Sequence, residues 1–182
     1  MKRTSYSFLL VILSVLTLLS SIPVRAEMFE SDLELLIKSL GYINELSDQS
    51  KLSLTIAFDP DSESSKAESE FVYQSPTIQK EFSRVFKKTI KQVISQANAD
   101  LIYVAARQSK MTADLLAHTK NKRIFAVSVD KECVLSGLCV LSITTRPILE
   151  IYLNDNTLKE LGFHIDPVFK FMVKRLGVKP WL

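Results

Sequence analysis

Apolar residues recur along the chain with two different periods, and the period changes from one segment to the next. Between Glu30 and Asp48 they recur every three or four positions, which predicts an amphipathic helix. From Leu52 to Phe58 they alternate every two positions and stop before Asp59-Pro60, which predicts a strand. Residues Asp61 to Glu70 are polar except for one alanine, a composition typical of a mobile surface loop.

Ser75-Pro76 begins the longest stretch of helical periodicity. Apolar residues continue at helical spacing to about Ala97, so we expect one long helix with proline in its first turn. The other positions of this helix carry five basic residues, namely Lys80, Arg84, Lys87, Lys88 and Lys91. They could form a patch for nucleic acid or anionic lipid, or an ordinary solvated helix face. The second interpretation is favoured because the exported chain has no net charge, as shown below.

The next segments predict a strand, a helix and a second strand. Asp100 to Ala106 and Arg123 to Val129 are short apolar runs typical of buried strands, and Thr112 to Lys120 between them has a helical pattern. Because such βαβ crossovers are right-handed, the two strands should be parallel.

The last sixty residues predict a hairpin and two short helices. Strands at Leu138 to Thr144 and Ile148 to Leu153 should form a hairpin. A helix from Asn154 to Leu161 should end at Gly162, and another should begin at Asp166-Pro167. The predicted fold is a single α/β domain with a mixed, mostly parallel sheet flanked by helices.

The first 26 residues have the pattern of an export signal. Lys2 and Arg3 precede an apolar core from Phe8 to Leu19, and small residues lead to a predicted cleavage site after Ala26. A permanent membrane anchor is the alternative, but the apolar core is shorter than the ~20 residues that span a bilayer. We therefore expect residues 27–182 to form a periplasmic domain that is not membrane-anchored.

Removing this segment changes the charge of the chain. The whole sequence has 23 Lys and Arg against 20 Asp and Glu, and the segment contains Lys2, Arg3 and Arg25 but no acidic residue. The exported chain is therefore balanced at 20 against 20. Nucleic-acid binding loses its compositional support, and no nucleic acid is expected as a partner.

Two cysteines lie six positions apart, and an export signal implies an oxidising compartment. Cys133 and Cys139 enclose Ser136-Gly137, which can turn the chain back on itself, so a disulfide is predicted. Closing so short a loop contributes about 2 kcal/mol in the chain-entropy model, which shapes a local turn more than it holds a domain together.

Motifs for catalysis, cofactors and metals are scarce. The chain has four glycines and lacks a Gly-rich phosphate loop, a Gly-x-Ser-x-Gly elbow and a Cys-x-x-Cys pair. Its two histidines, His118 and His164, lack metal-site spacing and are interpreted as structural or surface residues. Acidic pairs in the polar segment are interpreted as solvated. We expect no enzyme activity, no cofactor and no metal; Trp181 is either a partner anchor or a core residue.

The order of segments near the C-terminus resembles the YfiR-like family of small periplasmic regulators. Lys131 to Leu141 is similar to the family's cysteine loop, Ile148 to Asn154 to the strand that follows it, and Leu158 to Pro167 to its closing segment. The resemblance implies a non-enzymatic periplasmic protein that binds a membrane-anchored signalling protein and holds it inactive, typically a diguanylate cyclase. It also implies a possible homodimer.

The chain departs from this family in three places. The best-known members have a second disulfide between two strands, but the corresponding segments here read Leu52-Ser53-Leu54 and Ala99-Asp100-Leu101. The cysteine loop is one residue shorter, and Tyr152 stands where many members carry an acid.

Two functions therefore remain open. If the chain is a regulator, the candidate partner-binding residues are Tyr152 and Asn154, for which buried packing is an equally good role. The alternative is a periplasmic module that binds a small solute at strand ends, where Asp59, Asp130 and Arg107 fall.

Overall fold

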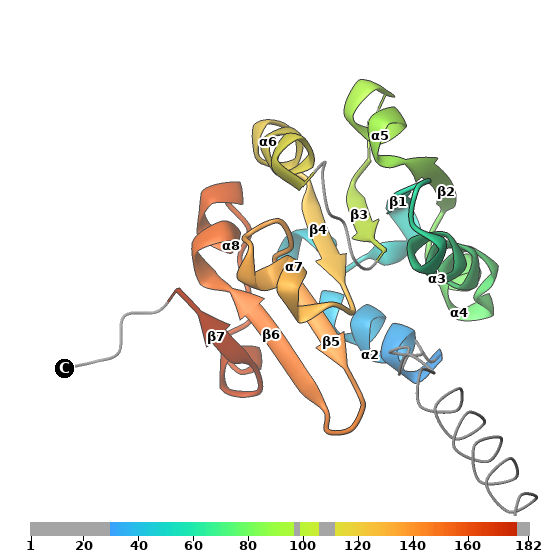
Figure 1. The fold of residues 1–182 in the computed structure, drawn as a ribbon. Coiled ribbons are helices and arrows are strands. Elements are labelled where there is room, and N and C mark those ends of the chain that lie inside the picture. Colours follow the sequence, from blue (N-terminus) through green and yellow to red (C-terminus); the bar gives the residue numbers. More distant parts are fainter. Residues whose placement is uncertain (1–29, 97–98, 106–111, 178–182) are drawn as a thin grey trace, which may run out of the picture.

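The computed structural model describes residues 30–96, 99–105 and 112–177, and seven strands of these residues form one sheet in the order β2-β1-β3-β4-β5-β6-β7 (Figure 1). The strands are Ser53–Phe58 (β1), Arg84–Thr89 (β2), Leu101–Val104 (β3), Phe125–Ser128 (β4), Leu141–Thr144 (β5), Glu150–Asn154 (β6) and Lys174–Leu176 (β7). All neighbouring pairs are parallel except the antiparallel β5–β6 hairpin. The mixed, mostly parallel sheet of a single α/β domain is thus confirmed.

Helices cover both faces of this sheet. They are α2 (Glu30–Leu40), α3 (Glu63–Gln74), α4 (Pro76–Glu81), α5 (Ile90–Gln96), α6 (Thr112–Lys122), α7 (Lys131–Leu135) and α8 (Asp155–Leu161), with single 3-10 turns at Asn44–Leu46 (η1), Gln49–Lys51 (η2) and Phe169–Phe171 (η3). Side chains of α2, α3, α4 and α8 pack on one face of the sheet, and those of α5, α6 and α7 pack on the other.

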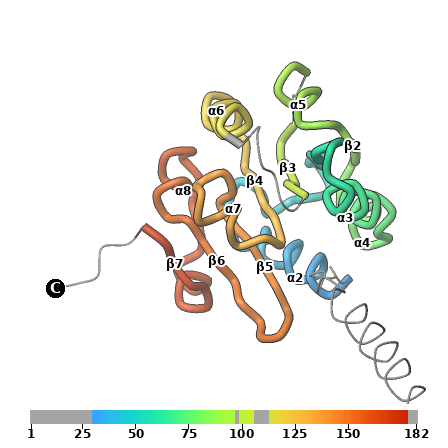
Figure 2. Tube along the Cα trace, viewed as in Figure 1, coloured from blue at the N-terminus to red at the C-terminus, as the bar shows by residue number. Residues whose placement is uncertain are grey.

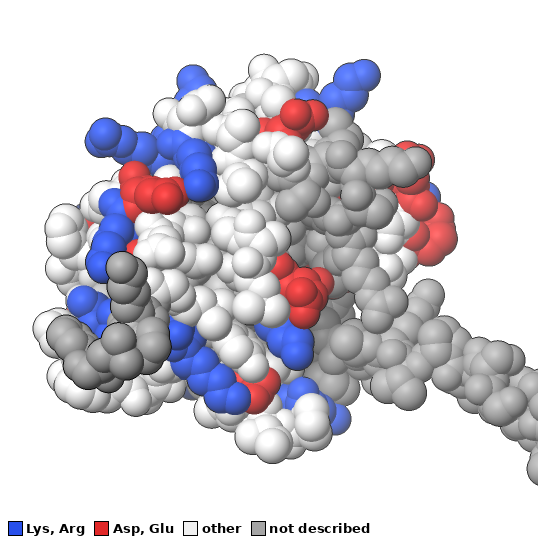
Figure 3. Space-filling model, turned by 60° about the vertical axis from the view of Figure 1, so that its left-hand side comes forward, with Lys and Arg blue, Asp and Glu red and all other residues white. Residues whose placement is uncertain are grey.

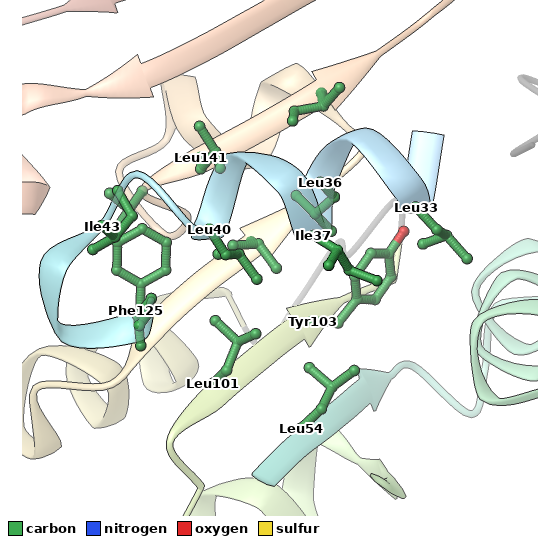
Figure 4. Close-up of a cluster of buried hydrophobic side chains, with 14 of the residues drawn as sticks. Leu33, Leu36, Ile37, Leu40, Ile43, Leu54, Leu101, Tyr103, Phe125 and Leu141 are labelled. Atoms are coloured by element: carbon green, nitrogen blue, oxygen red, sulfur yellow. The ribbon is translucent and has the colours of Figure 1, made fainter. Parts of the chain in front are cut away.

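The central strands are buried on both faces. In β3, Leu101 and Tyr103 point to the α2 side, whereas Ile102 and Val104 point to the α6 side. Figure 4 shows α2 lying across the sheet, with its leucines directed at Leu101 and Tyr103. Continuous apolar runs are the expected signature of strands with helices on both sides.

The two halves of the chain occupy opposite ends of the sheet. In the trace of Figure 2, the green β2 lies at one edge of the sheet and the orange β6 and red β7 lie at the other. Helix α2 is the exception, because it contacts β5 as well as α4. It therefore ties the N-terminal part of the described chain to the C-terminal hairpin.

The prediction of one long helix from Ser75 to Ala97 was wrong. Helix α4 ends at Glu81, β2 follows, and α5 completes the stretch. All six residues of β2 pair with β1, from Ser53↔Arg84 to Phe58↔Thr89. The six residues of β2 are too few to show a period of their own, so the apolar Val85 and Phe86 fitted the flanking helical pattern, whereas pairing with the distant β1 makes them a strand.

The prediction of a mobile loop at Asp61 to Glu70 was also wrong, because this segment lies largely within α3. The Ser62 hydroxyl caps the helix by accepting a hydrogen bond from the Ser65 N–H at 3.3 Å. Ser65 and Ser69 are buried and Val72 packs in the core, so small serines form the face that contacts the sheet. A hydropathy pattern counts serine as polar and misses such a face.

The first helix was predicted too long, and the helix predicted after Asp166-Pro167 was wrong. The first helix ends at Leu40, and Ile43 then forms an isolated bridge with Ile165. Asp166-Pro167 leads into η3 and β7 in place of a helix, because residues 174–176 pair with β6. In both places a pairing between residues distant in sequence replaces continued helix.

Candidate functional site

Cys133 and Cys139 are joined by a disulfide, with their Cα atoms 5.1 Å apart. Cys133 lies in α7, and Gly137 turns the chain with a φ of 79° so that the Cys139 N–H donates to the Cys133 carbonyl at 2.9 Å. A positive φ is easily adopted by glycine, which explains its place in this turn. Cys139 is fully buried and Cys133 is 9% exposed, so the disulfide is an internal crosslink.

Asn154 fastens this cysteine loop to the end of β6 and the start of α8. Its side-chain amide donates to the Val134 carbonyl at 3.0 Å, and its Oδ1 accepts from the Thr157 N–H at 3.0 Å as the helix cap. The Thr157 hydroxyl in turn donates to the Gly137 carbonyl at 3.2 Å. The amide nitrogen and Oδ1 of Asn154 thus both have hydrogen-bond partners within the chain. Asn154 would therefore contribute to partner binding by positioning the neighbouring surface.

Tyr152, the other sequence-predicted contact residue, is half-buried on β6. Its hydroxyl donates to the Glu150 carboxylate at 2.9 Å, and the Lys174 ammonium lies 5.5 Å from the ring centroid. Glu150 also pairs with Lys174. One side of the ring contacts the smaller core cluster, while its polar end lies with charged neighbours at the surface. Tyr152 therefore presents a partly exposed aromatic ring in a fixed orientation.

The alternative solute-binding residues lie at the carboxyl ends of the parallel strands. Asp59 follows β1, where its carboxylate accepts from the Asp61 N–H at 2.9 Å. Asp130 follows β4 and caps α7 by accepting from the Glu132 N–H at 3.0 Å. Both carboxylates serve local turns, and Arg107 lies outside the described residues.

Two further polar contacts at this edge were missed from the sequence. The hydroxyl of the fully buried Tyr103 donates to Glu68 of α3 at 2.6 Å. Burial, followed by the nearby Glu68 charge, raises the pKa of Tyr103 well above its ordinary value. Asp32, which is 4% exposed, accepts from the Thr145 N–H at 2.8 Å. A tyrosine within an apolar strand was the available signal, because a buried hydroxyl usually has a partner.

The histidines lie far from each other in the chain and in different settings. His118 is in α6, where burial and then the charge of Lys122 lower its pKa. His164 is exposed, and its Nδ1 lies 2.7 Å from Glu45. The parts of the chain that the structure describes contain no group of three or more His, Cys, Asp or Glu suited to a metal. Over the same ranges, no helix has the length and apolar character needed to cross a membrane.

A polar groove of about 500 Å³ lies between α2 and α4. Glu34 and Lys38 of α2, together with Lys80 and Glu81 of α4, line its walls, and Ile37 and Gly41 contribute apolar atoms. Two acidic and two basic side chains balance one another, and the Gln49 amide that also lines it already donates to the Ile37 carbonyl at 3.0 Å.

Comparison with known proteins finds solved structures of similar fold but no matching family. No family model matches the chain, and no curated protein matches it. A crystal structure of a conserved domain protein from Vibrio cholerae is similar, with a TM-score of 0.58 and 12% identity over 80% of this chain and 59% of that chain. A structure of an ABC domain from Streptococcus pneumoniae in complex with L-Trp has a TM-score of 0.58 and 9% identity, covering 76% of this chain and 58% of that chain.

The chain thus spans about three fifths of the length of these two solved structures. At such low identities the likeness shows the fold alone.

Proposed function

We propose that the exported chain is a non-enzymatic periplasmic regulator that binds a membrane-anchored signalling protein, in the first instance a diguanylate cyclase, and holds it inactive. The observation that carries this proposal is that the cysteine loop, β6 and α8 are held together by the disulfide and by hydrogen bonds of Asn154 and Thr157. This unit contains the segments that resemble the YfiR-like family, and it holds Tyr152 partly exposed in a fixed position. A surface fixed in advance loses little entropy when it binds a partner.

Restraint by binding requires only that the regulator prefer the inactive conformer of its partner. A preference of ~3 kcal/mol shifts that equilibrium more than a hundredfold. The balanced charge of the exported chain is compatible with a protein partner and gives no reason to expect nucleic acid. A homodimer of the regulator remains part of the proposal.

The test is to delete the gene and measure cyclic di-GMP. Deletion should raise the nucleotide level and surface attachment, and an export-competent copy should reverse both. A copy with Tyr152→Ala should lower cyclic di-GMP and surface attachment less than the native copy does at equal periplasmic abundance. Tyr73→Ala is the matched control, because Tyr73 is 39% exposed on α3 and also lies under a lysine, with Lys87 at 5.7 Å from its ring centroid. An unchanged nucleotide level after deletion contradicts the regulatory proposal.

A second candidate, supported by the likeness to the L-Trp-bound ABC domain, is binding of a small solute. The site would lie at the carboxyl ends of β1, β3 and β4, as is usual in parallel α/β sheets. Titration of the purified protein with L-tryptophan, followed by calorimetry and melting temperature, tests it. Saturable binding together with an unchanged cyclic di-GMP level on deletion would replace the first proposal with this one.

A further inference from the structure

Five apolar side chains project from two loops at one end of the sheet. They are Phe171 (91% exposed), Ile148 (68%), Val168 (63%), Met172 (59%) and Leu149 (52%), which we call the apolar tip. Ile148 and Leu149 lie in the turn before β6, and the other three lie in or beside η3, before β7. Because β6 and β7 are parallel neighbours, both loops enter the sheet from the same end.

The outward direction of these side chains is fixed by the residues between them. Phe169, the first residue of η3, is 1% exposed and stacks on Tyr42 with ring centroids 4.7 Å apart. The Asp166 N–H donates to the Tyr42 carbonyl at 2.8 Å, and the Asp166 carboxylate accepts from the Val168 N–H at 2.7 Å. The turn is therefore anchored on its inner side, and its remaining apolar side chains face solvent.

The charged side chains within the two loops of the apolar tip are basic, and the two acidic residues that flank the loops, Asp166 and Glu150, are engaged by the Val168 N–H and by Lys174. Residues 145–149 and 167–173 contain two charged side chains, Arg146 and Lys170, and both are basic. Glu150, at the start of β6, is paired with Lys174. Figure 3, in which the side of the molecule carrying β7 comes forward, shows several basic side chains along the lower edge, with acidic side chains and uncharged surface between them. Apolar side chains beside cations match the interface of an anionic lipid bilayer, where apolar groups enter the acyl region and lysines reach up to the head groups.

The shape of the apolar tip distinguishes lipid from a folded protein. A hairpin turn and a single 3-10 turn present side chains that project one by one, whereas the polar groove lies elsewhere, between α2 and α4. A protein partner would need a cavity complementary to each projection. A lipid interface accepts projecting apolar groups without a preformed shape.

We propose that the apolar tip inserts into the interface of an anionic membrane, so that the protein adsorbs reversibly to the bilayer surface. This goes beyond the proposed regulatory function and does not depend on it, since pure lipid contains no signalling partner. Adsorption would confine the protein to the surface where a membrane-anchored partner lies, and so raise their encounter frequency.

The test is sedimentation of the purified exported chain with vesicles of phosphatidylglycerol and phosphatidylcholine, compared with vesicles of phosphatidylcholine alone. The chain should sediment with the anionic vesicles, less with the neutral ones, and less still at high salt. Phe171→Ser should weaken anionic-vesicle binding about tenfold or more, and Lys170→Gln about fivefold. Phe171 is too exposed for its replacement to disturb the core, which urea unfolding verifies.

Phe86→Ser is the matched control, because Phe86 is 39% exposed, lies 5.4 Å from the Lys88 ammonium, and belongs to β2 at the opposite edge of the sheet. It should bind vesicles as the native chain does. Absence of native binding, or equal loss in Phe171→Ser and Phe86→Ser, would overturn the lipid assignment. If the native chain does not bind vesicles but Phe171→Ser impairs control of cyclic di-GMP in the cell, the apolar tip is a protein interface and the lipid proposal is wrong.

Discussion

The Asp100 carboxylate accepts two hydrogen bonds from Ser53, one from its backbone N–H at 2.8 Å and one from its hydroxyl at 2.7 Å. These contacts join the start of β1 to the residue before β3, which lies 47 positions away. The same two segments are where the best-known members of the resembling family have their second disulfide. Here a charge-assisted hydrogen-bond pair joins them without a covalent bond.

Replacing Asp100 with alanine should therefore lower the free energy of unfolding by about 2 kcal/mol, because the N–H and the hydroxyl of the buried Ser53 both lose their shared acceptor, Asp100 Oδ2. Asp100→Asn keeps one acceptor oxygen and should cost less. Urea unfolding measures the difference. Asp61→Ala, at an exposed carboxylate after β1, is the control and should change little; equal effects at both positions would contradict this role for Asp100.

Cys133 and Cys139 should resist alkylation until a reductant breaks their disulfide, because the disulfide leaves no thiol to alkylate. A reductant should lower the stability of the native chain by about 2 kcal/mol and leave it folded, since most of the core is independent of the crosslink. The Cys133→Ser/Cys139→Ser protein should show no response to reductant. Labelling of both thiols in untreated periplasmic protein would show that the disulfide does not form.

Arg175 of β7 lies 2.5 Å from the Asp155 carboxylate, whose side chain is 2% exposed. Arg175→Ala would leave that carboxylate buried without its cation and should cost about 3 kcal/mol, at the lower end of the range because the arginine is partly solvated. Asp155→Asn combined with Arg175→Ala should recover part of the loss, since the buried charge is then gone. Additive losses in the double variant would mean that the two residues act independently.

The lowered pKa of Glu30 predicts that the free energy of unfolding decreases at acid pH. Partial burial alone would raise its pKa, but hydrogen bonds from Ser75 and Thr77 outweigh it, and the pKa lies below its ordinary value of 4.5. A carboxyl with a depressed folded-state pKa contributes stability that is present above pH 4.5 and lost as the pH falls through the folded value. In the Glu30→Gln variant, the free energy of unfolding measured with urea should depend less on pH below about pH 5. An identical pH profile would exclude the contribution.

Gly162 ends α8 with a φ of 79°, and nothing lies within 4 Å of the place where a Cβ would stand. Gly162→Ala should therefore cost about 1 kcal/mol from backbone conformation alone. Gly162→Asn should cost less, because asparagine tolerates the left-handed region. Thermal unfolding of the two variants compares them, and a larger loss for asparagine would point to a steric cause instead.

The local sequence was enough to predict those elements that have a periodic pattern and capping residues of their own. The α8 helix has Asn154 as its cap and Gly162 at its end, and the β3–α6–β4 crossover follows from two apolar runs around a helix. The cysteine pairing also followed from short spacing and an export signal. In each case the deciding residues lie within about thirty positions of one another.

Elements whose identity depends on distant partners could not be derived in this way. β2 exists because β1 pairs along its length, and α3 is a helix whose serines face the sheet. Tyr103 and Glu68 are 35 positions apart, and Asp32 and Thr145 are 113 apart, so no local pattern indicates either contact. The candidate surface at Tyr152 was named from the sequence, whereas the projecting Phe171 lies in the segment after Asp166-Pro167, where the predicted helix does not form.

The sheet terminates in β2 on one side and β7 on the other, and both strands are rich in cations. β2 carries Arg84, Lys87 and Lys88, and β7 carries Lys174 and Arg175. An open strand edge invites another chain to add to it, and charged side chains oppose this because they would have to be buried. Arg84, Lys87 and Lys88, which also allowed a nucleic-acid patch as an interpretation, therefore have a different consequence: their charges oppose edge-to-edge aggregation at β2.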